Sequence, residues 1–97
     1  MTTVLIQHEV KDFTAWKRAF DQDPLRRGRG GVVRHVMWRA AGKPNFVLVQ
    51  LEFPKREDAD AYLMELERML PTVDDAIGFG PEAPKAWILE EVEQRTY

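Results

Sequence analysis

The sequence predicts an α+β fold in which two helices cover one face of a four-stranded antiparallel sheet. Four segments are rich in β-branched and aliphatic residues, and two others have apolar residues at helical spacing. Their order along the chain is strand, helix, strand, strand, helix, strand, which is the order of the ferredoxin-like βαββαβ sandwich. A chain of 97 residues has the size of one domain, so we expect a single domain over residues 1–97.

A short polar break separates the first strand from the first helix. Thr3–Val10 is mostly β-branched or aliphatic, and Lys11 interrupts the run. Asp12 is a favourable N-cap for the helix that follows. Large aromatic residues then recur at helical spacing, at Phe13, Trp16 and Phe20. We expect these rings to pack between the helix and the sheet.

The next segment contains a predicted turn and a predicted hairpin. Asp23 is a favoured cap and proline a favoured first helical residue, so we expect one further helical turn over Pro24–Arg27. Two strands follow, over Val32–Arg39 and Phe46–Phe53. The connection at 40–45 is rich in turn-forming residues and short enough for a hairpin.

The remainder of the chain predicts a second helix and a last strand. Apolar residues recur at helical spacing after Pro54, until Pro71 ends the pattern. We expect a short helical turn over Thr72–Ile77, an irregular segment over Gly78–Pro84, and the last strand over Lys85–Val92. The last five residues are expected to fray unless a neighbouring molecule holds them.

The strands carry apolar residues on both of their faces, which predicts a homodimer. The runs without alternation are Val4–Ile6, Phe46–Val49 and Trp87–Leu89. Because two helices can cover only one face of the sheet, the other face would be an apolar patch larger than monomers usually expose. We therefore expect two sheets to pack face to face about a two-fold axis and to enclose a space.

Alternation also predicts which side chains line that space. The third strand would direct Phe46, Leu48, Gln50 and Glu52 away from the helices, and the first strand Leu5, Gln7 and Glu9. We expect this face to be apolar toward one end and polar toward the other, with its Gln and Glu residues in one polar wall. The second strand stays open, because one slipped residue of hairpin register exchanges its two faces. The inward set is either Arg34, Val36 and Trp38 or His35, Met37 and Arg39.

Several segments together resemble a known family. They are the runs His8–Asp21, Arg39–Asn45, Leu51–Phe53 and Glu82–Pro84. In these segments the chain resembles the small dimeric α/β-barrel proteins of the antibiotic biosynthesis monooxygenase-like superfamily, over nearly its whole length. The resemblance implies that two ferredoxin-like domains pair as a dimeric α/β barrel. That superfamily includes cofactor-free quinone-forming monooxygenases, haem-degrading enzymes and isomerases, so the resemblance does not imply one activity.

Three residues are candidates for catalysis. His8 and His35 could accept a proton near neutral pH without a large pKa shift. In an enzyme, one of them would deprotonate a phenol or enol, and Arg39 or Gln50 would hold the developing oxyanion. The alternative is that each histidine has a structural role at a strand end or an interface.

Four residues are candidates for substrate binding. Trp38 and Phe46 could stack on an aromatic substrate, and Gln50 and Glu52 would contribute polar contacts, with Arg34 or Arg39 as the counter-charge. Each has an alternative role at a dimer interface, where aromatic side chains pack and carboxylate–arginine pairs set the register.

Composition excludes several other functions. The chain has no cysteine and no histidine pair at metal-ligand spacing, so we expect neither a metal nor another cofactor. A net charge of −2 does not favour nucleic acid as a partner. The apolar stretch at the start is too short for a signal peptide or a membrane span, so we expect a cytoplasmic protein without a membrane partner.

Two functions remain open. One is a small cofactor-independent monooxygenase, isomerase or cyclase that acts on a hydrophobic, ionisable, often aromatic metabolite in a cavity at the dimer. The other is a non-catalytic dimeric module that binds a small ligand or another protein through the same surfaces.

Overall fold

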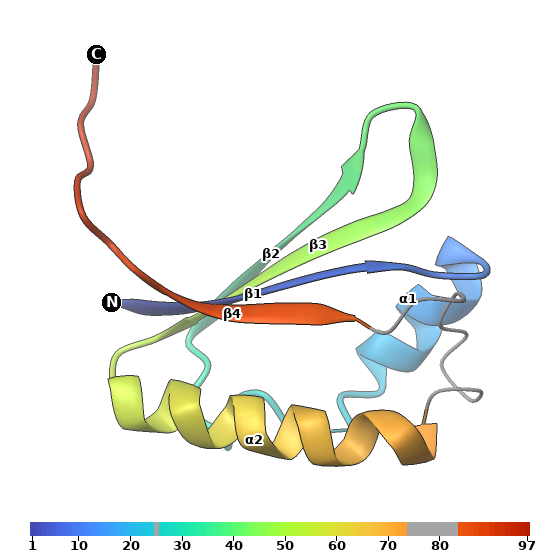
Figure 1. The fold of residues 1–97 in the computed structure, drawn as a ribbon, viewed down its shortest axis with the longest axis horizontal. Helices are drawn as coiled ribbons and strands as arrows, with labels where there is room; N and C mark the ends of the chain where they lie inside the picture. Colours follow the sequence, from blue (N-terminus) through green and yellow to red (C-terminus); the bar gives the residue numbers. More distant parts are fainter. Residues whose placement is uncertain (25, 74–83) are drawn as a thin grey trace.

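The computed structural model describes residues 1–24, 26–73 and 84–97 (Figure 1). The elements in these ranges are β1 (Thr2–Glu9), α1 (Phe13–Asp21), β2 (Arg34–Ala40), β3 (Lys43–Phe53), α2 (Arg56–Val73) and β4 (Lys85–Glu90). The sheet has the strand order β2-β3-β1-β4, and each neighbouring pair is antiparallel. This arrangement is the predicted ferredoxin-like βαββαβ sandwich.

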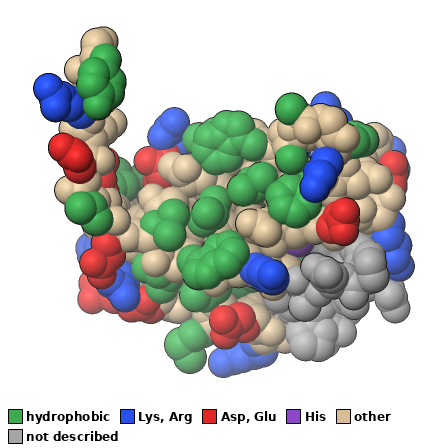
Figure 2. All heavy atoms as spheres, turned by 45° about the horizontal axis from the view of Figure 1, so that its top comes forward, with side chains coloured by type: hydrophobic (Ala, Val, Ile, Leu, Met, Phe, Trp, Pro, Cys, Tyr) green, Lys and Arg blue, Asp and Glu red, His purple; other side chains and the backbone are tan. Residues whose placement is uncertain are grey.

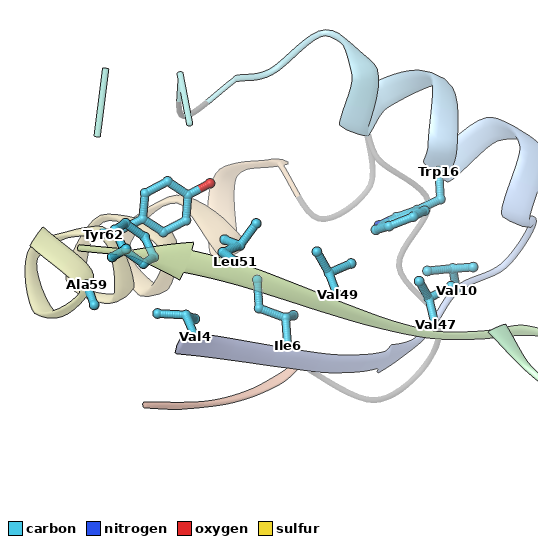
Figure 3. Close-up of a cluster of buried hydrophobic side chains, with 10 residues drawn as sticks. Val4, Ile6, Val10, Trp16, Val47, Val49, Leu51, Ala59 and Tyr62 are labelled. Atoms are coloured by element: carbon cyan, nitrogen blue, oxygen red, sulfur yellow. The ribbon is translucent and has the colours of Figure 1, made fainter. Parts of the chain in front are cut away.

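The core lies between the two central strands and the helices. Its buried side chains come from alternate positions of β1 and β3, and from both helices: Val4, Ile6, Val47, Val49, Leu51, Phe53, Trp16, Ala59 and Tyr62. Figure 3 shows most of these side chains pointing from the strands toward the helices. Successive residues of a strand point to opposite faces, so the alternating burial confirms the predicted orientation of β1 and β3.

A capping network joins the start of α1 to β3. The Asp12 carboxylate accepts a hydrogen bond of 2.9 Å from the backbone N–H of Ala15, which confirms the predicted N-cap. The side-chain oxygen of Asn45 accepts a bond of 3.0 Å from the N–H of Phe13, and its Nδ2 donates to the carbonyl of Lys11 at 3.3 Å. Asn45 therefore satisfies a free N–H of the first helical turn from a strand 32 residues away.

Replacement of Asn45 should weaken the junction between α1 and β3. We expect Asn45→Ala to lower the free energy of unfolding by about 1–2 kcal/mol, because it removes both side-chain hydrogen bonds and leaves a helix N–H without its cap. Urea denaturation followed by far-UV circular dichroism measures the change. Thr14→Ala, at an exposed position of the same helix, is the control and should change stability by less than about 0.5 kcal/mol. An equal effect of the two substitutions would contradict the proposed role of Asn45.

The structure corrects the expected helical turn over Pro24–Arg27. Asp23 and Arg26 have φ angles of 55° and 52°, in the left-handed region, so the backbone cannot continue a right-handed helix there. Arg27 stabilises the turn instead: its N–H donates to the Asp23 carboxylate at 2.8 Å, and its guanidinium lies 3.8 Å from the centre of the Phe20 ring.

The remaining boundaries differ slightly from expectation. β3 begins at Lys43 rather than Phe46, because the hairpin pairs Ala40 with Lys43 across a register shift. β4 ends at Glu90 rather than Val92. The expected segments Thr72–Ile77 and Gly78–Pro84 fall mostly outside the described residues. Among the helices that are described, none has the length and apolar composition that a membrane span requires.

Candidate functional site

One face of the sheet carries no helix, and we call it the open face. Strand register and alternation place on it Arg34, Val36 and Trp38 from β2, Phe46, Leu48, Gln50 and Glu52 from β3, Thr3, Leu5, Gln7 and Glu9 from β1, and Lys85, Trp87 and Leu89 from β4. Trp38, Trp87 and Leu89 are 47%, 43% and 42% exposed. Figure 2 shows hydrophobic side chains gathered over this side of the sheet. The open face therefore carries seven apolar residues, three of them large and exposed, beside seven polar or charged ones.

The register of the hairpin settles the orientation of β2. Arg34 lies opposite Glu52, and Trp38 lies opposite Leu48, so the first of the two alternative sets is on the open face. His35 and Arg39 lie opposite the buried residues Leu51 and Val47, so they are on the helix side of the sheet.

The expected polar wall does not form. β1 and β3 run antiparallel, so the polar end of each strand lies beside the apolar end of the other: Gln7 pairs with Leu48, and Glu9 with Phe46. Glu52 lies opposite Thr3, six residues along β1 from Glu9, which is about 20 Å in an extended strand. The expectation of one apolar end and one polar end was wrong, because it treated each strand separately and ignored their opposite directions.

A polar hollow of about 360 Å³ lies at the end of the open face where β1 and β3 pair Thr3 with Glu52. Its lining residues are Met1, Thr3, Arg34, Gln50, Glu52, Leu89, Glu90, Glu91 and Gln94. The Arg34 guanidinium donates to the Glu52 carboxylate in an ion pair across β2 and β3. The Glu52 side chain is mostly covered, whereas the Arg34 side chain is 61% exposed and open to a ligand. The hollow thus combines one guanidinium with two amides, three carboxylates and two apolar side chains.

The polar hollow unites only some of the predicted binding residues. Gln50 and Glu52 line it together with Arg34, the counter-charge that the sequence suggested. Trp38 and Phe46 share the open face but are not among its lining residues. The sequence analysis singled out neither Glu91 nor Gln94 as a site residue: Glu91 was expected within the last strand, and Gln94 among the last five residues, which were expected to fray.

His8 is buried on the helix side, away from the polar hollow. Its ring meets Trp16 edge to face, with 5.2 Å between the ring centres. Burial disfavours the charged imidazolium and lowers the pKa of His8 to about 4. The His8 side chain is therefore neutral at neutral pH and is a weak base.

His35 and Arg39 lie on the same side as His8, against aromatic residues of α1. The His35 ring is 5.4 Å from the Phe20 ring, and the Arg39 guanidinium is 4.5 Å from the centre of the Phe13 ring. Trp16 and Phe20 are also in contact, at 5.2 Å between ring centres, so His8 and His35 are connected through two aromatic rings. The structure thus gathers the three predicted catalytic residues along α1 and separates them by the sheet from Gln50 and Glu52.

A second hollow, of about 340 Å³, lies between α2 and the turn that precedes β2. Among its lining residues are Arg26, Gly30, Asp58, Tyr62 and Glu65. Burial raises the pKa of Tyr62 to about 12, so its hydroxyl stays protonated. No group of three or more potential metal ligands occurs in the part of the chain that the structure describes.

Comparison with known proteins establishes the fold. No family model matches the sequence, and no curated protein matches it. A candidate antibiotic biosynthesis monooxygenase from Nitrosomonas europaea is 20% identical, with a TM-score of 0.68 over 96% of this chain and 100% of that one. SnoaB, a cofactor-independent oxygenase from Streptomyces nogalater, is 16% identical, with a TM-score of 0.72 over 96% and 94%.

A third solved structure is described as a dimeric ferredoxin-like protein and comes from an uncultured marine organism. It is 13% identical, with a TM-score of 0.63 over 97% of both chains. The agreement of fold covers nearly the whole of each chain, while the low identities leave the activity undetermined. The chain therefore has the ferredoxin-like fold of the antibiotic biosynthesis monooxygenase-like proteins, as its sequence resemblance implied.

Proposed function

We propose that the chain acts as a homodimer whose two open faces pack together and enclose a cavity for a hydrophobic, ionisable, often aromatic metabolite. The observation that carries this proposal is the exposed apolar surface on the open face, where Trp38, Trp87 and Leu89 are each more than two-fifths exposed. Large exposed apolar patches usually serve as an interface or a ligand site. The dimeric state described for one protein of the same fold supports the same assembly here.

The polar hollow supplies the recognition of an ionised group. When a second sheet covers the open face, Arg34 and Gln50 lie in a layer with little water and can donate hydrogen bonds to an anionic oxygen. The anion would compete with Glu52 for Arg34, and the charges of Glu90 and Glu91 in the same hollow would oppose it. Trp38 and Phe46 supply aromatic surface in the same layer. Such a cavity suits a phenolate or an enolate attached to an apolar ring system.

The reaction that fits this cavity is cofactor-independent and of the oxygenase, isomerase or cyclase type. Loss of a proton makes a phenol or enol electron-rich enough to be the electron donor itself, and Arg34 would favour this ionised form of the substrate. In the oxygenase form, O₂ converts a ring methylene to a carbonyl: one oxygen atom enters the product, and the other leaves as water with the two methylene hydrogens. The cofactor-independent oxygenase among the proteins of the same fold supports this form of the proposal.

A non-catalytic dimeric binding module is the second candidate, and one observation favours it. His8, His35 and Arg39 lie on the helix side of the sheet, so the histidines that could move a proton are separated from the polar hollow. In that case the cavity would bind the same class of molecule without turning it over.

Replacement of Arg34 tests the proposal. We expect Arg34→Gln to weaken binding or turnover of a hydroxylated polycyclic phenol by about 10–100-fold, because a charge-assisted hydrogen bond to the anion is lost. Quinone absorbance under air measures turnover, and quenching of tryptophan fluorescence measures binding. Arg18→Gln, at an exposed position on α1, is the matched control and should behave like the parent chain.

The outcomes of this experiment separate the two candidates. Quinone formation that depends on Arg34 supports the oxygenase, whereas binding that depends on Arg34 without any product supports the binding module. If the chain neither bound nor converted any phenol of a broad panel, this result would contradict both candidate functions.

A further inference from the structure

The second hollow, between α2 and the turn that precedes β2, holds opposite charges on its two sides. Arg26 lines it from the turn, and Asp58 lines it from the first turn of α2. Neither residue forms an ion pair with another residue that the structure describes. Glu65 also lines the hollow, but its carboxylate already accepts a bond of 3.0 Å from Arg68. A guanidinium and a carboxylate thus share a hollow of about 340 Å³ without pairing, so both charges are available to a ligand.

The hydroxyl of Tyr62 is a third polar group of the second hollow. Tyr62 is only 7% exposed, and its ring packs on Phe53 with 5.6 Å between the ring centres. Figure 3 shows the hydroxyl directed away from α2. In the described part of the chain no hydrogen bond reaches this hydroxyl, and the nearby charges of Asp23 and Arg27 pair with each other. Because buried polar groups usually have a partner, a hydroxyl that lines a hollow without one indicates a place for a polar atom of a ligand.

Close packing of the turn on α2 fixes the shape of the second hollow. The carbonyl of Arg26 accepts a hydrogen bond of 3.0 Å from the N–H of Gly30, which closes the turn. A Cβ atom at Gly30 would lie 3.1 Å from the Tyr62 ring. A Cβ atom at Gly31, whose φ angle is 101°, would lie 2.9 Å from the Asp58 carboxylate. The two glycines therefore let the turn approach α2 without displacing the two side chains that line the hollow.

We propose that the second hollow binds a free α-amino acid with an apolar side chain. Arg26 binds the carboxylate of the ligand, and Asp58 accepts hydrogen bonds from its ammonium group. Tyr62 follows Asp58 by one helical turn, so its hydroxyl is on the same face of α2 and bonds to the same polar end of the ligand. Pro24, Ala61 and the ring of Tyr62 supply apolar surface for the ligand's side chain.

The charge and the size of the second hollow both favour this class of ligand. A ligand with a single charge would leave either Arg26 or Asp58 without a counter-charge, whereas a zwitterion satisfies both. Ligand pockets usually have volumes of about 300–1,000 Å³, so a hollow of about 340 Å³ suits a small molecule. The site is separate from the polar hollow on the open face, and the inference does not depend on the homodimer.

Three probes with the same apolar group test which charges the site requires. L-leucine carries both charged groups, isoamylamine lacks the carboxylate, and isocaproate lacks the ammonium group. We expect leucine to bind at least about 10-fold more tightly than either of the others, because each charge-assisted hydrogen bond contributes a factor of about that size. Isothermal titration calorimetry with the full chain measures the three dissociation constants.

Two substitutions assign the two ends of the ligand. Arg26→Gln should weaken leucine binding about 10-fold or more and leave isoamylamine binding unchanged. Asp58→Asn should weaken leucine binding by a similar factor without weakening isocaproate binding. Arg29→Gln, at an exposed position of the same turn, and Glu57→Gln, at an exposed position of α2, are the matched controls and should bind leucine like the parent chain. Circular dichroism checks that each variant is folded.

Three results would overturn the proposal. One is that the parent chain binds no leucine, which is expected if Arg26 and Asp58 close into a direct ion pair in solution. Another is that leucine binds no more tightly than isoamylamine or isocaproate, since the site would then not read both charges. The third is that leucine binding is the same in the Arg26→Gln and Asp58→Asn chains as in the parent, because the ligand would then lie elsewhere.

Discussion

Leu48→Asp is expected to convert the dimer to a monomer without unfolding the chain. Leu48 lies in the middle of the open face, between Gln7 on β1 and Trp38 on β2. A two-fold axis buries two copies of each open-face residue, and each unpaired buried carboxylate costs several kcal/mol. The dimer dissociation constant should rise at least 1,000-fold, because about 4 kcal/mol corresponds to that factor. Sedimentation equilibrium, with a parent mass near twice 11.3 kDa, measures the change.

The matched control for this variant is Met64→Asp. Met64 is also a large apolar residue and is 62% exposed, but it lies on α2, on the other side of the sheet. The control chain should remain dimeric, and both variants should keep the circular dichroism spectrum of the parent, because neither side chain belongs to the core. A Leu48→Asp chain that dimerises as tightly as the control would remove the basis for a cavity between open faces.

His8 should make the protein sensitive to mild acid. Its pKa is about 4 in the folded chain and near 6.5 in an unfolded one, so between these values the unfolded state binds a proton that the folded state does not. The contribution of neutral His8 to the free energy of unfolding is therefore complete above pH 6.5 and is lost as the pH falls toward 4. At pH 4.5 the expected loss is roughly 2 to 3 kcal/mol relative to pH 7.5. Urea denaturation at the two pH values, at one protein concentration, measures it.

The test of this pH dependence compares two histidine variants. His8→Gln lacks the titrating group, so its stability should fall less between pH 7.5 and pH 4.5 than that of the parent chain. His35→Gln, which replaces the other histidine of the chain at an exposed position, is the control for the loss of an imidazole. If His8→Gln and the parent lost the same free energy of unfolding over this range, the acid sensitivity would have to come from other groups.

Local patterns were sufficient to predict much of the sheet. Val47, Val49, Leu51 and Phe53 are a wholly apolar set at alternate positions, whereas the other set includes Gln50 and Glu52, and this difference predicted that the first set faces the helices. The same reasoning placed Phe46, Gln50 and Glu52 on the open face. Asp12 was identified as a helix cap because its type and its position before an amphipathic stretch suffice for that role.

The arrangement of the candidate site could not be predicted in the same way. The two faces of β2 differ by one residue of hairpin register, and β3 begins three residues earlier than expected, with a register shift between Arg39 and Ala40. That pairing moved His35 and Arg39 to the helix side and brought Arg34 to Glu52. The conformation of Asp23 could not be predicted from the sequence either. Asp23 followed by proline favours the start of a helix, but its positive φ angle ends the right-handed helical conformation.

The sequence by itself determined the order of the elements, the buried side of β1 and β3 and the surplus of apolar strand residues, because each depends on spacing within one segment. Only the tertiary structure decided which residues meet. Antiparallel pairing set the polar end of β1 beside the apolar end of β3, and hairpin register joined Arg34 to Glu52 in the polar hollow. The tertiary structure also decided the direction that residues 91–97 take after β4. These features depend on how separate segments align, and the energy that selects one alignment comes from contacts that exist only in the folded chain.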